Sequence, residues 1–272
     1  MSLSLALLSA HSPTMMMADM HPKTVPALQK LAADFQEVDA ILVTSSHWLI
    51  QDGFAANAAT RPAYIQDYYG FPPDYYQVRY ESPGDVELAS AVVQAAQAEG
   101  LSAATTLDWG LDHGHWTPLL WLRPAADIPV VPLSISHLSP SDHVRWGRAI
   151  RRAAEADGRR IAFIASGSLT HRIDMVTWGC NEPFPEGERF DRAVIDILTT
   201  GRWGDLDTFD PALAREAAPE GGWGPLFTLR GVMGEEARGE LVSYERQFTA
   251  ASLATVLFRI EDGAGEGSGP AR

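Results

Sequence analysis

The sequence predicts an α/β fold: a single domain in which a central, largely parallel or mixed sheet is flanked by helices on both faces. Continuous apolar runs, typical of strands buried on both sides, alternate along the chain with segments of helical periodicity. The 272 residues show no internal repeat and no break in composition. That length suits one α/β domain with a sizeable core.

Each predicted element has a local signature. The strands are the runs LSLALLSA, which ends at Ala10, AILVTSS (40–46), IPVVPLSIS (128–136) and RIAFIASGS (160–168). Helices are predicted over 24–38, 85–100 and 139–158, and the second begins at Asp85 and ends on Gly100, residue types that cap helices. After Gly187 we expect a helix, a Gly-rich bend at 220–224, a helix through Met233 and strands near 239–246 and 251–260.

Charge and cysteine content restrict the partners and the compartment. The chain has 21 Lys and Arg against 35 Asp and Glu, a net charge of -14, which disfavours nucleic acid and anionic membranes as partners. The single cysteine, Cys180, excludes an intrachain disulfide and favours a cytoplasmic location. The apolar N-terminus has no basic region and is too short to span a bilayer. We expect one domain over residues 1–260 and a disordered, Gly-rich tail over 261–272.

Three histidines follow apolar strands in the same way. His11 follows LALLSA, His47 follows ILVTSS and His171 follows FIASGSLT. The carboxyl ends of parallel strands lie at one edge of an open α/β sheet, where ligands bind, so these side chains can converge. His113, in the Gly-bracketed turn GLDHGHW, is a fourth candidate. Taken singly, each is more often a hydrogen-bonded structural histidine than a ligand.

The other histidines have weaker contexts. His115 either points away from this turn or lines the rim of the site, and His143, at a helix start, is expected to face solvent. His21 and His137 are interpreted as structural. Several imidazoles with a carboxylate suit zinc, or ferrous iron bound by two histidines and one carboxylate. The chain has no CxxC, HExxH, GxSxG or Walker pattern.

Four strings in order along the chain resemble the class III extradiol ring-cleavage dioxygenases of the protocatechuate 4,5-dioxygenase catalytic-subunit type. They are SSHW (45–48), DYYGFPPDYYQVRYESPGD (67–85), GLDHGHWTPL (110–119) and ASGSLTHR (165–172). The first half is most similar to the aromatic-diol (DOPA-type) branch. The second half, through ASGSLTHR and EGGWGPLFTLRGVMG (220–234), is more similar to the homoprotocatechuate 2,3-dioxygenase branch. The resemblance extends to about residue 260 and implies a catalytic dioxygenase domain over 1–260.

The resemblance implies a non-haem Fe(II) enzyme that opens a catechol beside its diol with O2, and it assigns roles to five residues. His11 and His47 match the two histidine ligands, and Glu220 matches the carboxylate ligand, with Glu216 as its competitor. His171 matches the catalytic histidine of the family. Imidazole suits that role because its pKa allows both acid and base steps. His113 matches a second histidine that hydrogen-bonds substrate or oxygen. The family also suggests a homo-oligomer.

Two other functions stay open on the same scaffold: a zinc-bound metalloenzyme, such as a hydrolase, and a non-catalytic binding protein. Retention of four suitably placed histidines argues against the latter. Arg79 and Arg172 are candidates for binding a substrate carboxylate. Five aromatic residues are candidates for the pocket wall or for loop packing: Tyr68, Tyr69, Phe71, Tyr75 and Tyr76.

Overall fold

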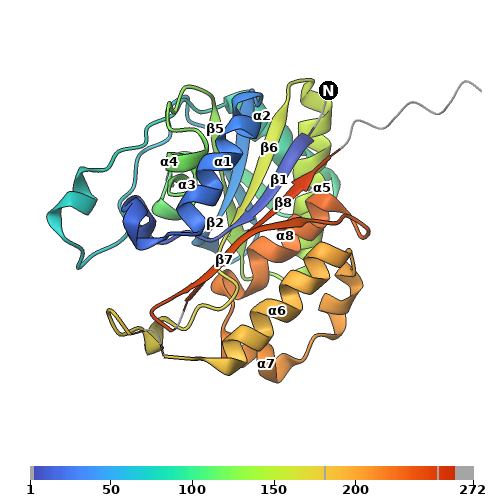
Figure 1. Cartoon of the computed structure of the whole chain (residues 1–272). Coiled ribbons are helices and arrows are strands. Elements are labelled where there is room, and N and C mark those ends of the chain that lie inside the picture. The colour runs from blue at the N-terminus through green and yellow to red at the C-terminus, as the bar shows by residue number, and fades with distance from the viewer. Residues whose placement is uncertain (1–2, 181, 250, 261–272) are drawn as a thin grey trace, which may run out of the picture.

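The computed structural model describes residues 3–180, 182–249 and 251–260, which form a mixed eight-stranded sheet between two layers of helices (Figure 1). The strand order is β4-β3-β5-β2-β6-β1-β8-β7. The four middle strands are parallel to one another, whereas β3 is antiparallel to β5, β8 to β1, and β7 to β8. The bounds are β1 (Leu3–Ser9), β2 (Ala40–Ile50), β3 (Phe54–Asn57), β4 (Ala103–Thr106), β5 (Val130–Ser136), β6 (Ile161–Ser166), β7 (Glu240–Gln247) and β8 (Ala251–Arg259). The predicted fold class is confirmed.

Helices cover both faces of the sheet. On one side lie α1 (Thr24–Gln36), α3 (His113–Trp116) and α4 (Leu119–Leu122). On the other lie α2 (Val86–Ala98), α5 (Pro140–Asp157), α6 (Pro185–Thr200), α7 (Pro211–Ala217) and α8 (Gly224–Met233). The predicted cap at Asp85 is present: its side chain accepts from the backbone N–H of Leu88. The Ser139 side chain caps α5 in the same way, by accepting from the backbone N–H of Asp142.

Alternate residues of each central strand belong to two separate cores. In β6, Ala162 and Ile164 pack in the core beneath α1, while Phe163 and Ala165 pack in the core beneath α5 and α8. Side chains that are buried on either face are mostly apolar, which explains the continuous apolar runs of the sequence. Burying a side chain such as Phe163 contributes about 1.5–3 kcal/mol to stability.

β2 contains the irregularity that positions His47. Its pairing with β5 is regular up to Thr44 and resumes only at Leu49, so residues between these two leave the ladder. The expectation that the strand ends before His47 is wrong, because pairing with β5 continues the strand to Ile50.

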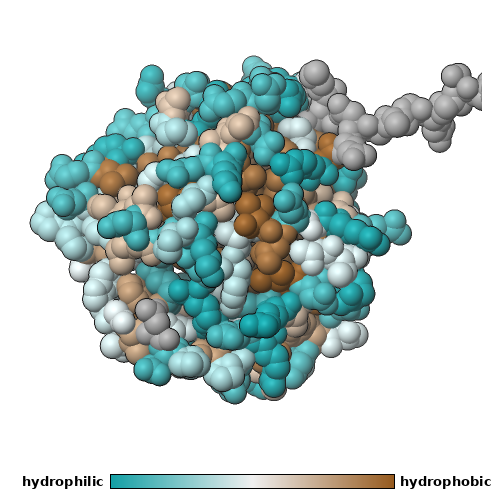
Figure 2. Space-filling model, viewed as in Figure 1, coloured by the Kyte–Doolittle hydropathy of each residue, from teal (hydrophilic) through white to brown (hydrophobic). Residues whose placement is uncertain are grey.

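Most of the face shown in Figure 2 is hydrophilic, and hydrophobic side chains form a patch near its middle. No helix among the described residues is long and apolar enough to cross a membrane. The predicted tail, 261–272, lies outside the described residues.

Candidate active site

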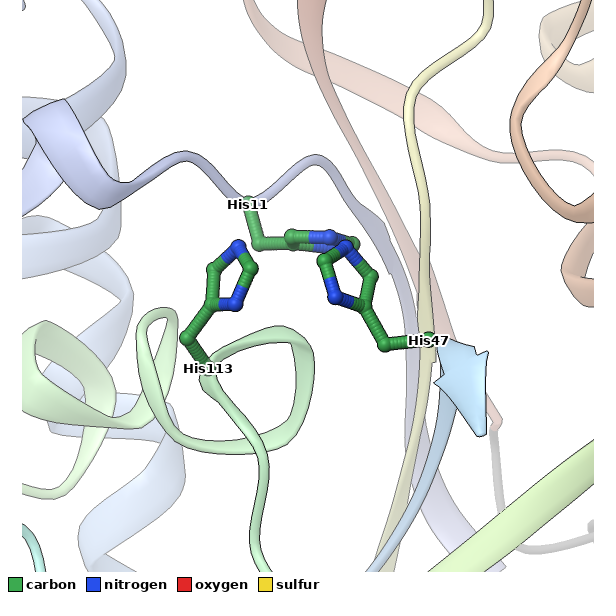
Figure 3. A group of neighbouring side chains, drawn as sticks. All are labelled: His11, His47 and His113. Atoms are coloured by element: carbon green, nitrogen blue, oxygen red, sulfur yellow. The ribbon is translucent and has the colours of Figure 1, made fainter. Parts of the chain in front are cut away.

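Side chains from five segments converge at the carboxyl edge of the parallel strands. His11 follows β1, His47 projects from the irregular part of β2, and His113 opens α3 (Figure 3). Their rings are close: the centroids of His11 and His47 are 4.9 Å apart, those of His11 and His113 5.1 Å, and those of His47 and His113 4.2 Å. His171 follows β6, and Glu220 opens a short 3-10 helix, Glu220–Trp223. The structure therefore brings together the three histidines that follow strands, and it adds His113 and Glu220 to them.

Glu220 lies at the centre of this group. Its Oε1 is 3.1 Å from His11 Nε2, 3.3 Å from His47 Nε2 and 3.6 Å from His171 Nε2. Its other oxygen accepts a 2.7 Å hydrogen bond from the backbone N–H of Ser168. Burial alone would raise the pKa of this carboxyl, but the neighbouring imidazoles hold it well below its usual range. Glu220 is therefore an anion with one oxygen fixed and the other facing the histidines.

The Gly-rich bend after Glu220 brings it there. Gly221 has φ +61°, in the left-handed region, and a Cβ at this position would lie 2.4 Å from Ile135 Cδ1. Only glycine fits both the conformation and the close approach to β5. The predicted bend thus has a specific function: it turns the chain so that α8 starts immediately behind the carboxylate.

The hydrogen bonds of His11 determine which ring nitrogen faces the site. The Ser166 hydroxyl donates to the backbone carbonyl of Gly114 at 2.6 Å, so it accepts from His11 Nδ1, 3.0 Å away. His11 therefore donates from Nδ1 and turns Nε2 toward the site, where that nitrogen could bind a metal.

Asp67 orients the rings of two histidines at once, His47 and His113. Its Oδ2 is 2.6 Å from His47 Nδ1, and its Oδ1 is 2.8 Å from His113 Nδ1 and 2.9 Å from the His113 backbone nitrogen. Burial would raise the pKa of Asp67, but its bonds to both histidines hold that pKa far below its usual range. Both rings thus donate from Nδ1 to Asp67, so Nε2 is the nitrogen of each ring that could bind a metal. Sequence reasoning missed Asp67, although it is the first residue of the quoted string DYYGFP.

The pKa of His47 is raised by the two carboxylates beside its ring. Burial alone would lower it, but the hydrogen bonds to Asp67 and Glu220 raise it to about 10. For His113, burial outweighs the contact with Asp67 and lowers the pKa. A cation bound between Glu220 and the imidazoles would replace the proton on His47, because ligand imidazoles are neutral.

α3 is held tightly against β2. The Ser45 hydroxyl donates to Asp112, the residue before α3, at 2.7 Å, and a Cβ on Gly114 would lie 2.2 Å from the Ser45 oxygen. Glycine at 114 is required for this approach, which places His113 beside His47.

The structure also locates the remaining histidines. His115 is buried, and its Nε2 donates to the carbonyl of Leu133, pointing away from the site. The expectation that His143 faces solvent is wrong: it is 3% exposed, and its Nε2 accepts from the backbone N–H of Ser136, because the first turn of α5 packs against the end of β5. His21 is buried beside Thr14, whereas His137 is exposed.

A cavity of about 500 Å³ opens onto this group. Its wall includes the five converging residues together with Tyr68, Tyr69 and Phe71. The candidates Tyr75 and Tyr76 do not line it; Tyr75 is buried and packs beside Phe71. The aromatic loop therefore supplies part of the pocket wall and part of its own support.

Neither candidate arginine lines this cavity. The guanidinium of Arg79 donates to the carbonyls of Tyr76 and Val78, and that of Arg172 donates to Asp174. The interpretation of these arginines as carboxylate-binding residues is not supported by their positions.

The donor set fits a metal ion of the first transition row. Donor atoms bound at about 2.0–2.2 Å around one ion lie about 3 Å from each other, and the separations of Glu220 Oε1 from the two Nε2 atoms match this value. The ligand atoms of His11, His47 and His113 also lie within 4.8 Å of one another. Glu216 lies on α7, with its side chain exposed and 3.7 Å from Arg172, outside this group.

The structure defines an α/β protein whose sheet is covered on both faces and whose imidazoles and carboxylate form a group that could bind a metal ion. Residues 5–256 match the family described as the catalytic LigB subunit of aromatic ring-opening dioxygenase. The chain belongs to this family and is an extradiol ring-cleaving dioxygenase, an oxidoreductase.

Individual relatives agree with both branches indicated by the sequence. A 4,5-DOPA dioxygenase extradiol of Beta vulgaris is 32% identical over 209 residues, 75% of this chain and 76% of that protein. A 3,4-dihydroxyphenylacetate 2,3-dioxygenase of Escherichia coli is 24% identical over 268 residues, 92% of this chain and 97% of that protein. The crystal structure of an uncharacterized protein from Escherichia coli K12 shares the fold, with a TM-score of 0.71, 24% identity, and coverage of 93% of this chain and 99% of that one.

Proposed function

We propose that the protein is an Fe(II)-dependent extradiol dioxygenase that cleaves a catechol-type aromatic diol with O2. The observation that carries this proposal is the position of Glu220 Oε1, 3.1 and 3.3 Å from the Nε2 atoms of His11 and His47. Two imidazoles and one carboxylate leave further coordination positions open, the arrangement used by non-haem Fe(II) oxygenases.

His11, His47 and Glu220 are the proposed ligands, and Fe(II) there would supply Lewis acidity and a template for diol and dioxygen. Ser166 and Asp67 accept hydrogen bonds from Nδ1 of His11 and His47. Nε2 is then the nitrogen of each ring that would bind the ion. Zinc suits the same donors, so the chemistry of the site has to be tested with each ion.

His171 and His113 flank the ligands on the cavity wall. His171 Nε2 lies 3.6 Å from Glu220 Oε1 and is partly exposed, so a diol entering the cavity meets it. We assign it the role of accepting a proton from the diol and returning a proton during ring opening. His113 is locked by Asp67 through Nδ1, and we assign its Nε2 a hydrogen bond to the bound diol or oxygen.

Activity is tested directly. The protein is loaded anaerobically with Fe(II), mixed with a panel of catechols, exposed to O2 and followed for the yellow, ring-opened semialdehyde. Zinc-loaded protein is the control and is expected to give no colour. Full iron loading without colour from any catechol would contradict the proposal and favour a zinc enzyme or a binding protein.

The ligand assignment is tested by metal binding. His47→Ala and Glu220→Ala are expected to lose stoichiometric metal binding, whereas His113→Ala is expected to keep it. Retention of metal by Glu220→Ala together with its loss by His113→Ala would show instead that the three histidines form the donor set.

A further inference from the structure

The mouth of the active-site cavity is apolar. Four of the nine exposed large hydrophobic side chains found among the described residues line this one cavity: Tyr69, Ile173, Val176 and Trp178. Trp178 is 61% exposed, and its ring lies 4.8 Å from that of Phe248 and 6.5 Å from that of Phe71. Soluble proteins seldom gather such side chains on the surface without a ligand or partner to cover them.

The rim comes from two segments that flank the site. Tyr69 and Phe71 belong to the aromatic loop that also carries Asp67, whereas Val176 and Trp178 follow His171 after β6. The same cavity therefore has the proposed ligands at its base and apolar side chains at its opening. A catechol that places its diol at the ligands directs its ring substituent toward this opening.

Outside its histidines, the described wall of the cavity offers no cation to a charged substituent. No Lys or Arg occurs among the described residues of its wall, and its carboxylate, Glu220, is held by imidazoles and Ser168. In the adjoining hollow, which shares Gln247 and Phe248 with it, Arg246 donates to Asp191 and to the Thr249 carbonyl. A carboxylate on the substituent would lose water without gaining a lysine or arginine as a partner, which is costly.

We propose that this site selects catechols whose ring substituent is uncharged and apolar, with Val176 and Trp178 as specificity-determining residues. The inference rests on the proposed ring-cleaving function and narrows its substrate class. The two relatives compared above are named for DOPA and 3,4-dihydroxyphenylacetate, both of which carry a carboxylate. The wall described above has no lysine or arginine to pair with that charge.

The test compares three catechols of similar size on the Fe(II)-loaded protein: 4-propylcatechol, 3-(3,4-dihydroxyphenyl)propionate and dopamine. Two methylene groups separate each charge from the ring, so the acidity of the diol changes little. We expect kcat/KM for 4-propylcatechol to exceed that of either charged compound at least tenfold, with the difference mainly in KM. Anaerobic titrations, followed by tryptophan fluorescence, should give dissociation constants in the same order.

A charge introduced at the rim provides the matched experiment. Val176 is 42% exposed, so Val176→Lys places an ammonium at the cavity mouth without burying it. We expect this variant to raise the ratio of kcat/KM for the propionate to that for 4-propylcatechol about tenfold, and added salt should diminish the gain. Leu107→Lys adds the same charge at a residue that is 69% exposed and outside the cavity, and should leave the ratio unchanged.

The outcomes separate this inference from the function on which it rests. If a charged catechol is cleaved with an equal or higher kcat/KM than 4-propylcatechol, the selectivity is overturned while ring cleavage stands. An unchanged ratio in Val176→Lys would overturn the assignment of that residue. Absence of cleavage of every catechol at full iron loading would overturn the proposed function and this inference with it.

Discussion

Replacing Asp67 by Asn tests whether the site depends on residues behind its ligands. Asp67 accepts three hydrogen bonds: one from His47 Nδ1 at one oxygen, and two from His113 at the other. Asparagine has nearly the same shape but offers one acceptor oxygen and one NH2 group. The orientation that loses least keeps the oxygen toward His113 and turns the NH2 group toward His47, where two donors then face each other.

The loss in metal affinity follows from this geometry. To relieve the conflict, His47 must accept at Nδ1 and carry its proton on Nε2, which removes its lone pair from the site. Loss of a partner that orients a ligand histidine typically weakens metal binding 10- to 100-fold, about 1.4–2.8 kcal/mol. We expect a change of this size for Asp67→Asn, with the fold retained.

The assay is an anaerobic competition titration of Fe(II) or Zn(II) against a chromophoric chelator, with thermal unfolding as a check of the fold. Asp108→Asn is the matched control, because Asp108 is exposed and its side chain accepts from the Thr106 hydroxyl rather than from a histidine of the site. If folded Asp67→Asn protein binds metal within about twofold of the wild type, the positioning role of Asp67 is refuted.

Three further predictions concern other parts of the chain. His171→Ala should keep its metal but slow turnover about 10²- to 10⁴-fold, the usual contribution of a positioned acid–base group; near-normal turnover would exclude that role. Gly114→Ala should lower both the melting temperature and the metal affinity, because the new Cβ would lie 2.2 Å from the Ser45 hydroxyl; unchanged values of both would contradict this packing argument. Glu245 accepts a hydrogen bond from the first backbone N–H of α1. Burial alone would raise the pKa of Glu245, but its contacts lower that pKa, and the contact with His21 contributes most. Its stabilising effect is therefore fully present above the unfolded pKa and is lost as pH falls through the folded pKa. The difference in unfolding free energy between wild type and Glu245→Gln should thus be about 2 kcal/mol at pH 7 and shrink below about pH 4.5; a difference independent of pH would be inconsistent with it.

The central sheet could be predicted because its signals are local. The four parallel strands are continuous apolar runs, and the helices between them carry caps that the structure confirms at Asp85 and Ser139. The short elements β3, β4, α3 and α4 have four residues each, too few for a period to show. β3, for instance, is formed by FAAN, whose strand conformation depends on pairing with β4 and β5.

His143 shows why the burial of a side chain is harder to predict than the helix in which it lies. Its position at the start of α5 was recognisable from Ser139 and the proline that follows, but its exposure depends on which way that turn faces. The turn packs on the end of β5 and near Phe54, whose ring centroid is 5.2 Å from that of His143. No spacing within the helix specifies that contact.

The same distinction separates the candidate ligands from the residues that orient them. A histidine after an apolar strand is recognisable because parallel strands end at a common edge, and His11, His47 and His171 do meet there. Asp67 lies in an aperiodic loop, and its position beside two imidazoles depends on how that loop folds back over the sheet. Yet it is this carboxylate that accepts hydrogen bonds from Nδ1 of His47 and His113 and so turns Nε2 of both rings toward the site. Chains that share the ligands can therefore differ in metal affinity through the residues behind them, and the loop after β3 is where such a difference should be sought first.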